Sequence, residues 1–92
     1  MDIRRKKLHF RSWHRGTKEL DLILGCFADC FLKDMSEQEL DIYEEILACE
    51  DTELIAWIEG ATKPPENKNT PLLQRLLHLN HMQQHQDEYD TS

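Results

Sequence analysis

Apolar residues recur at helical spacing along most of this 92-residue chain, and every regular segment is interpreted as a helix. The clearest series predicts a helix that begins after Gly16, with Thr17 as a candidate N-cap. Its apolar face consists of Leu20, Ile23, Leu24, Phe27 and Phe31. A looser series predicts an earlier helix from near Asp2 toward Ser12, with apolar positions at Ile3, Leu8, Phe10 and Trp13.

Two further helices follow, each with a recognisable end. Ser36 and Glu39 have the spacing of a capping box, which predicts a helix whose inner face is Leu40, Tyr43, Ile46 and Leu47. Either Asp51 or Thr52 is expected to cap a short fourth helix. Gly60 should end that helix, because glycine tolerates the left-handed conformation at a helix C-terminus. Its apolar residues are Leu54, Ile55, Trp57 and Ile58.

The last predicted helix starts at Thr70-Pro71, after a loop over residues 61–69, because proline is well tolerated at the first helical position. Its inward side chains are expected to be Leu72, Leu73, Leu76, Leu77 and Leu79. The pattern predicts an all-α fold, a compact bundle of about five short helices. Residues 1–86 should form one domain, and residues 87–92 a polar, disordered tail.

A domain of this size buries only a modest share of its surface and has little room for a deep catalytic pocket. The sequence also contains no nucleophile motif with a base and a third group to orient it. We therefore expect a binding module and not an enzyme.

Charge is distributed unevenly around a net value of -7. Residues 1–18 hold seven Lys or Arg and one acid, a balance of +6, whereas residues 19–92 hold four Lys or Arg and seventeen acids, a balance of -13. Such a dipole can orient a partner during encounter. Nucleic acid is not expected as a partner, because the acidic body would repel phosphate. No apolar stretch is long enough to span a membrane.

Cysteine and histidine leave a metal-binding alternative open. Cys26, Cys30 and Cys49 are odd in number and lie in apolar helical patterns, which favours reduced thiols. Cys26 and Cys30 are spaced i,i+4, and His78, His81 and His85 share one side of the last helix. Neither set completes a four-ligand pattern, so no metal site is predicted and a solvated helix end is the simpler interpretation for the histidines.

The candidate functional residues lie at the turn between the first two helices. Gly16 can adopt positive φ there, and the helix that follows presents free N–H groups. Arg15 offers a planar cation suited to a carboxylate, and Glu19 can accept a bond in the first helical turn. From residue chemistry alone an alternative stays open, in which Arg15 and Glu19 simply pair with each other at i,i+4 spacing.

The string Arg15-Gly16-Thr17-Lys18-Glu19 resembles the R-G-x-x-E motif of the succinate dehydrogenase flavinylation-factor family. The resemblance extends over nearly the whole chain and includes the approach to the motif, its continuation and stretches of the third and fourth predicted helices. These stretches are Trp13-His14-Arg15-Gly16, residues 19–24, residues 40–44 and residues 51–60.

The resemblance implies a five-helix bundle that binds the flavoprotein subunit of succinate dehydrogenase, or of fumarate reductase, and promotes covalent attachment of FAD to a histidine of that subunit. FAD is then the partner's cofactor and is not held stably here. The resemblance implies partner contacts at Arg15, Gly16 and Glu19, and we extend the surface to His14 and Lys18. Tyr43, Asp51 and Trp57 are either secondary contacts or supports of the bundle, and packing is the commoner role of such aromatics.

Localisation and assembly follow from the same resemblance. A bacterial chain would be cytoplasmic and a eukaryotic one would lie in the mitochondrial matrix, although the basic start lacks the serine-rich character of a transit peptide and is interpreted as part of the domain. The free protein is expected to be a monomer. The competing hypothesis is a small helical adaptor, unrelated to flavin, that binds other proteins through its acidic face.

Overall fold

The computed structural model describes residues 2–79. It contains the helices α1 (Ile3–Trp13), α2 (Lys18–Phe31), α3 (Glu37–Ala48) and α4 (Asp51–Glu59). Two short 3-10 turns follow α2 and α4, at Leu32–Asp34 and Glu66–Lys68, and residues 71–79 form a further helix. Residues 2–79 contain no strand, so the all-α prediction is confirmed. The tail expected at 87–92 and the histidines at 81 and 85 lie outside the described residues.

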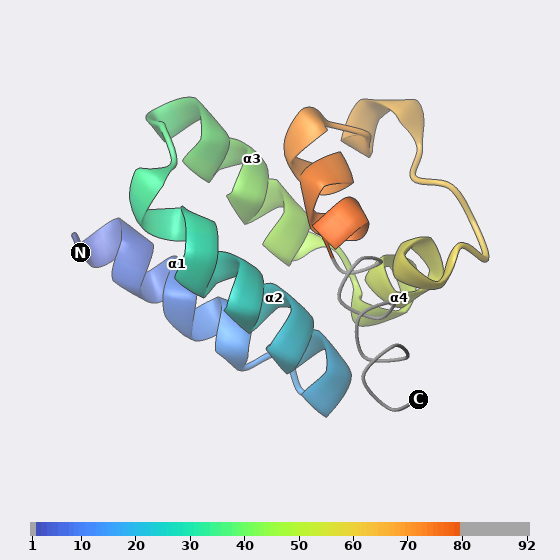
Figure 1. Ribbon diagram of the computed structural model, residues 1–92, viewed down its shortest axis with the longest axis horizontal. Helices are drawn as coiled ribbons and strands as arrows, with labels where there is room; N and C mark the ends of the chain where they lie inside the picture. The colour runs from blue at the N-terminus through green and yellow to red at the C-terminus, as the bar shows by residue number, and fades with distance from the viewer. Residues whose placement is uncertain (1, 80–92) are drawn as a thin grey trace, which may run out of the picture.

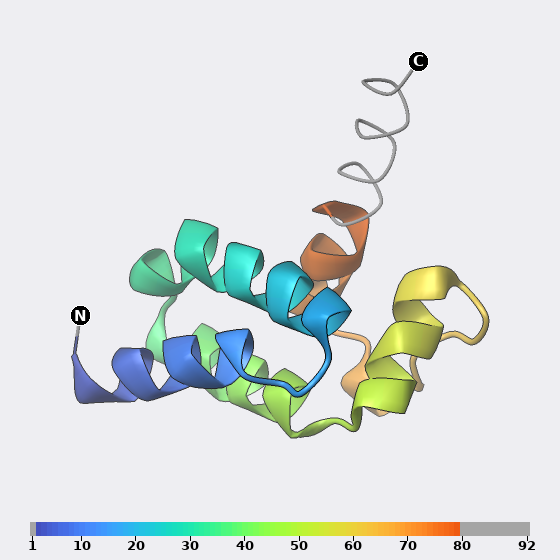
Figure 2. The same cartoon turned by 90° about the horizontal axis from the view of Figure 1, so that it is seen from below.

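The helices are arranged so that the chain turns back on itself twice. α1 and α2 lie side by side and antiparallel, and α3 packs against them (Figures 1 and 2). α4 and the helix of residues 71–79 lie near the C-terminal end of α3. The bend between α1 and α2 lies at this same end of the molecule.

One apolar cluster joins all five helices. The predicted inner face of α3 supplies it, and so do Leu72, Leu73 and Leu76 of residues 71–79, whereas Leu77 and Leu79 are only partly buried. Most of the predicted face of α2 belongs to it as well. Ile23 and Phe31, which were also expected on that face, are only partly buried. The fully enclosed side chains include Leu20, Leu24, Leu40, Tyr43, Leu54 and Leu73.

The first helix has the predicted position, and only part of its loosely spaced apolar series is buried. Leu8 is enclosed, but Ile3 and Phe10 are 73% and 61% exposed. The buried side of the helix consists of Leu8 and Ser12, which is the side turned toward α2 and α3.

Most predicted helix ends are confirmed. Thr17 caps α2, Ser36 and Glu39 form both bonds of the capping box, and the Thr70 hydroxyl accepts a bond from the Leu73 N–H. Gly60 ends α4 at φ +78°. The predicted cap of α4 is wrong: Glu50 is the N-cap and makes no side-chain bond. Asp51 lies in the first turn instead, and its carboxylate has another partner.

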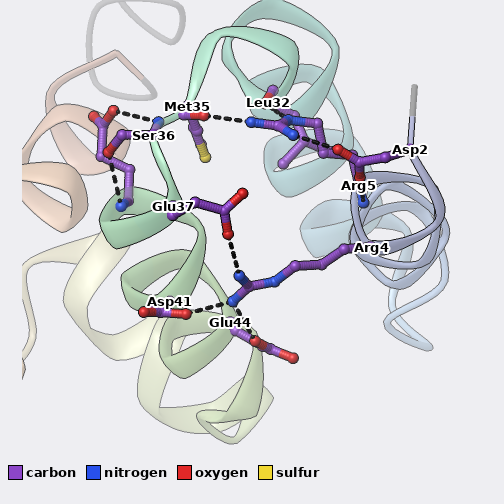
Figure 3. Close-up of polar contacts among 10 residues, drawn as sticks. Asp2, Arg4, Arg5, Leu32, Met35, Ser36, Glu37, Asp41 and Glu44 are labelled. Atoms are coloured by element: carbon purple, nitrogen blue, oxygen red, sulfur yellow. Dashed lines mark hydrogen bonds and ion pairs between the residues drawn. The ribbon is translucent and has the colours of Figure 1, made fainter.

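Two neighbouring arginines attach α1 to the elements around it (Figure 3). The Arg4 guanidinium contacts the carboxylates of Glu37, Asp41 and Glu44 along α3. Asp41 and Glu44 raise the pKa of Arg4, so its guanidinium stays charged. Arg5 donates instead to the backbone carbonyls of Leu32 and Met35 after α2. Exposed ion pairs add little stability, so the Arg4 contacts mainly fix the orientation of α1.

A buried hydrogen-bond network connects three helices across the core. The buried Ser12 and Tyr43 hydroxyls lie 2.6 Å apart, and one of them donates to the other. The hydroxyl that accepts donates in turn to a backbone carbonyl, which is Leu8 for Ser12 or Leu24 for Tyr43. Burial raises the pKa of Tyr43 to about 12, which keeps the hydroxyl protonated as a donor. Each polar atom is thus satisfied inside an apolar core.

Gly25 of α2 packs directly against the Trp13 indole of α1. A Cβ at this position would lie 2.2 Å from the Trp13 indole, so the ring occupies the space that only glycine leaves free. We expect Gly25→Ala to destabilise the fold by about 1–3 kcal/mol through overpacking. Urea unfolding followed by circular dichroism measures this loss.

A second background tests the cause of that loss. In Trp13→Leu the indole is absent, and alanine favours a helix over glycine by about 1 kcal/mol. Gly25→Ala should then be neutral or stabilising. A similar loss in both backgrounds would contradict the packing explanation.

Candidate functional site

The bend between α1 and α2 leaves its glycine open to solvent. Gly16 has φ +106°, and nothing lies within 4 Å of where a Cβ would stand. Glycine is needed here for its backbone conformation and not for close packing, because L side chains rarely adopt this φ. The predicted turn is therefore confirmed, and the bend is not sealed inside the bundle.

The Arg15 side chain turns away from the open side and enters the junction between α3 and α4. Its guanidinium contacts Asp51 at 2.7 Å and donates to the backbone carbonyls of Leu47 and Cys49. Only 11% of the side chain is exposed. These carbonyls lie at the C-terminal end of α3, where a cation is favoured by unsatisfied backbone acceptors.

The backbone of the bend is fixed from the other side by α2. The Arg15 N–H donates to the Asp21 carboxylate at 2.5 Å, and the Thr17 hydroxyl accepts the Leu20 N–H at 3.4 Å. The bend is thus held on its inner side by Arg15 and on its α2 side by Asp21. A surface fixed in this way loses little conformational freedom on binding.

The predicted site residues divide into two groups. His14, Gly16, Lys18 and Glu19 are exposed around the bend, whereas Arg15 is largely covered. The pair between Arg15 and Glu19 that the spacing allowed is absent among residues 2–79, since Arg15 binds Asp51 instead. The imidazole of His14 stacks on the Phe10 ring at 3.9 Å.

The three residues considered as secondary contacts or supports all support the bundle. Tyr43 is fully enclosed and Trp57 is 7% exposed. Asp51 is the carboxylate partner of Arg15. The sequence contains no local signal for this pairing, because the two residues lie 36 positions apart. It also gave no sign of the Asp21 contact, which crosses a turn outside the usual capping spacing.

The remaining chemistry of residues 2–79 is sparse. Cys26, Cys30 and Cys49 are free thiols, and burial raises the pKa of Cys49. The described part of the chain gathers no three metal-ligating side chains in one place. Its helices are too short or too polar to cross a bilayer.

A small helical bundle with an open bend, held rigid from within, defines a protein-binding module. The sequence comparison agrees with this class and makes it specific. Residues 6–80 match the family described as flavinator of succinate dehydrogenase, and the chain belongs to that family. This family comprises assembly factors and not enzymes.

Curated relatives come from bacteria and mitochondria. The chain is 42% identical over 74 residues to the FAD assembly factor SdhE of Acetobacter pasteurianus. The aligned region covers 80% of this chain and 68% of that relative. It is 32% identical over 78 residues to the mitochondrial succinate dehydrogenase assembly factor 2 of Drosophila grimshawi, with 83% and 53% covered. For the Caenorhabditis elegans factor the identity is 38% over 69 residues, with 73% and 58% covered. The chain spans little more than half of these mitochondrial relatives.

The Arg15 contacts predict that removing this side chain lowers the stability of the fold. Arg15→Ala would leave two backbone carbonyls and the Asp51 carboxylate without their donor. We expect a loss of about 2–3 kcal/mol in the free energy of unfolding. Lys18→Ala is the matched control, since Lys18 is exposed and forms no ion pair within residues 2–79. Equal urea midpoints for the two variants would show that the Arg15 contacts do not stabilise the fold.

Proposed function

We propose that this chain binds the flavoprotein subunit of succinate dehydrogenase and promotes covalent attachment of FAD to it. Support comes first from the family match, which covers the bend and all the helices that hold it. It comes also from the geometry of the bend, which is open at Gly16 and braced at Arg15. A flavoprotein of the fumarate reductase type is a second substrate to test.

FAD itself is proposed to remain with the flavoprotein. The apolar groove lined by Ile23, Cys26, Phe27, Cys30, Phe31, Leu76 and Leu79 has a volume of only about 110 Å³. Pockets for drug-sized ligands have roughly 300–1,000 Å³, so this groove does not fit a dinucleotide. A wider depression of about 530 Å³ carries Glu45, Glu50 and Glu53, whose charges would repel a pyrophosphate. Neither of these two depressions of residues 2–79 therefore fits FAD.

The contribution of this chain is then alignment of its partner. The covalent chemistry belongs to the flavin, and an assembly factor can lower the barrier by fixing geometry and excluding water. We assign contact with the flavoprotein to His14, Gly16, Lys18 and Glu19, which are exposed around the bend. Arg15 is assigned a positioning role, because its guanidinium is engaged with Asp51 and the end of α3.

The proposed compartment is that of the flavoprotein. Relatives are named from a bacterium and from mitochondria, so we propose the bacterial cytoplasm or the mitochondrial matrix according to the source of the chain. The free chain is proposed to be a monomer.

A bulky side chain at the bend should block docking. Gly16→Arg places a long cation where the surface is open, and we expect covalent flavin on the partner subunit to fall at least tenfold. In-gel flavin fluorescence of that subunit measures this directly.

Gly16→Ala is the matched control for Gly16→Arg. Both variants carry the same backbone strain at φ +106°, on the order of 1–2 kcal/mol, but alanine adds almost no bulk. Alanine should therefore retain most of the flavinylation. If both variants lost flavinylation equally, backbone strain and not blocked docking would be the cause. If both variants retained flavinylation, the bend would have no part in the function.

Glu19 tests the polar side of the same surface. The carboxylate is exposed, and the α2 cap is made by Thr17, so Glu19→Ala should change the free energy of unfolding by less than about 0.5 kcal/mol. Flavinylation should nevertheless fall, because a contact with the partner is lost. A parallel loss of stability and flavinylation would favour a helix-start role for Glu19.

A further inference from the structure

The outer side of α1 carries an apolar and cationic stripe that the bundle does not use. Ile3, Lys6, Lys7, Phe10 and Arg11 line one shallow depression at helical spacing. Ile3 and Phe10 are two of the three large apolar residues that are exposed within residues 2–79. Apolar side chains grouped in this way on a small domain commonly mark an interaction site.

The cations of this stripe are available for a partner. Arg4 and Arg15 have acidic partners inside the chain, as described above, and Arg5 pairs with Asp2 at 2.5 Å in addition to its backbone contacts. Lys6, Lys7 and Arg11 form no salt bridge within residues 2–79. The positive end of the molecule is therefore concentrated on the outer side of α1, while the rest of the chain is acidic.

The stripe is continuous with the bend. The Phe10 ring stacks on the His14 imidazole at 3.9 Å and 14°, and the His14 Nδ1 lies 2.7 Å from the Phe10 carbonyl. His14 lies two residues before Gly16 in the chain, next to Arg15, whose side chain is held by Asp51. One partner can therefore contact both the stripe and Gly16. The stack also holds the exposed phenyl ring in place.

We propose that the outer side of α1, at Ile3, Lys6, Lys7, Phe10 and Arg11, docks an acidic surface with apolar side chains on the flavoprotein subunit. This inference rests on the proposed function and extends its contact surface beyond the bend. An acidic partner is repelled by most of this chain, whose net charge is -7, and is attracted only by this stripe. Charge therefore selects the approach that also brings the partner to Gly16.

Two other occupants fit less well. A second copy would have to present its acidic α3, but Glu37, Asp41 and Glu44 are already engaged by Arg4. An anionic membrane would attract the stripe and repel the remaining body. The apolar part of the stripe comprises only Ile3 and Phe10, which is far less apolar surface than a membrane-surface helix buries.

The test measures binding of the purified flavoprotein subunit to the full chain by calorimetry at low and high ionic strength. Phe10→Ala should weaken binding roughly tenfold, as for a central interface residue, and Phe10→Leu should retain most of it. Lys7→Glu should weaken binding and reduce its salt dependence. Lys63→Glu has the same charge change at an exposed position outside the stripe, and it should bind as the wild type does.

The outcomes separate this inference from the function on which it rests. If the wild type binds and supports flavinylation while Phe10→Ala and Lys7→Glu bind equally well, the stripe is not a docking surface and the function stands. If the wild type does not bind the flavoprotein, both proposals fall. Two results would assign the stripe to another occupant if flavoprotein binding stayed unchanged. One is concentration-dependent self-association that Phe10→Ala abolishes, and the other is vesicle binding that Lys7→Glu abolishes.

Discussion

The bend between α1 and α2 depends on one buried cation. Arg15 reaches from the bend to Asp51 in the first turn of α4 and to two carbonyls at the end of α3, so its guanidinium connects the bend to both helices. A planar group with several donors can satisfy these acceptors together, which an ammonium group cannot do as well. Because the inner side of the bend is held in this way, its outer side can stay open at Gly16 without becoming a loose loop.

The basic N-terminal segment serves two separate purposes. Arg4 and Arg5 attach α1 to α3 and to the turn after α2 (Figure 3). Lys6, Lys7 and Arg11 instead line a depression on the outer surface. Around the α1 axis Lys6 and Lys7 point away from Arg5, whereas Arg11 lies two turns beyond Arg4 on nearly the same side and forms no salt bridge within residues 2–79. One short run of cations therefore contributes both to the fold and to the surface that a partner meets.

The small core places limits on where function can reside. Tyr43, Ser12 and the leucines around them fill the interior, and the apolar groove beside Phe27 and Phe31 is too small for a dinucleotide. A domain of this size has a margin of only about 5 kcal/mol, so it has little capacity to store strain at an internal site. Surface recognition is the function that such a bundle supports best, which agrees with its membership of a family of assembly factors.

The sequence by itself determined the helices, most of their ends and the family. Local signals were sufficient for these, because the Ser36–Glu39 capping box, Thr17 and Gly60 act on neighbouring residues. It also located the bend at Gly16. Tertiary structure decided which side of α1 is buried and which residue Arg15 binds. Ile3 and Phe10 are exposed because burial depends on the neighbouring helices, and Asp51 reaches Arg15 only when the chain has folded.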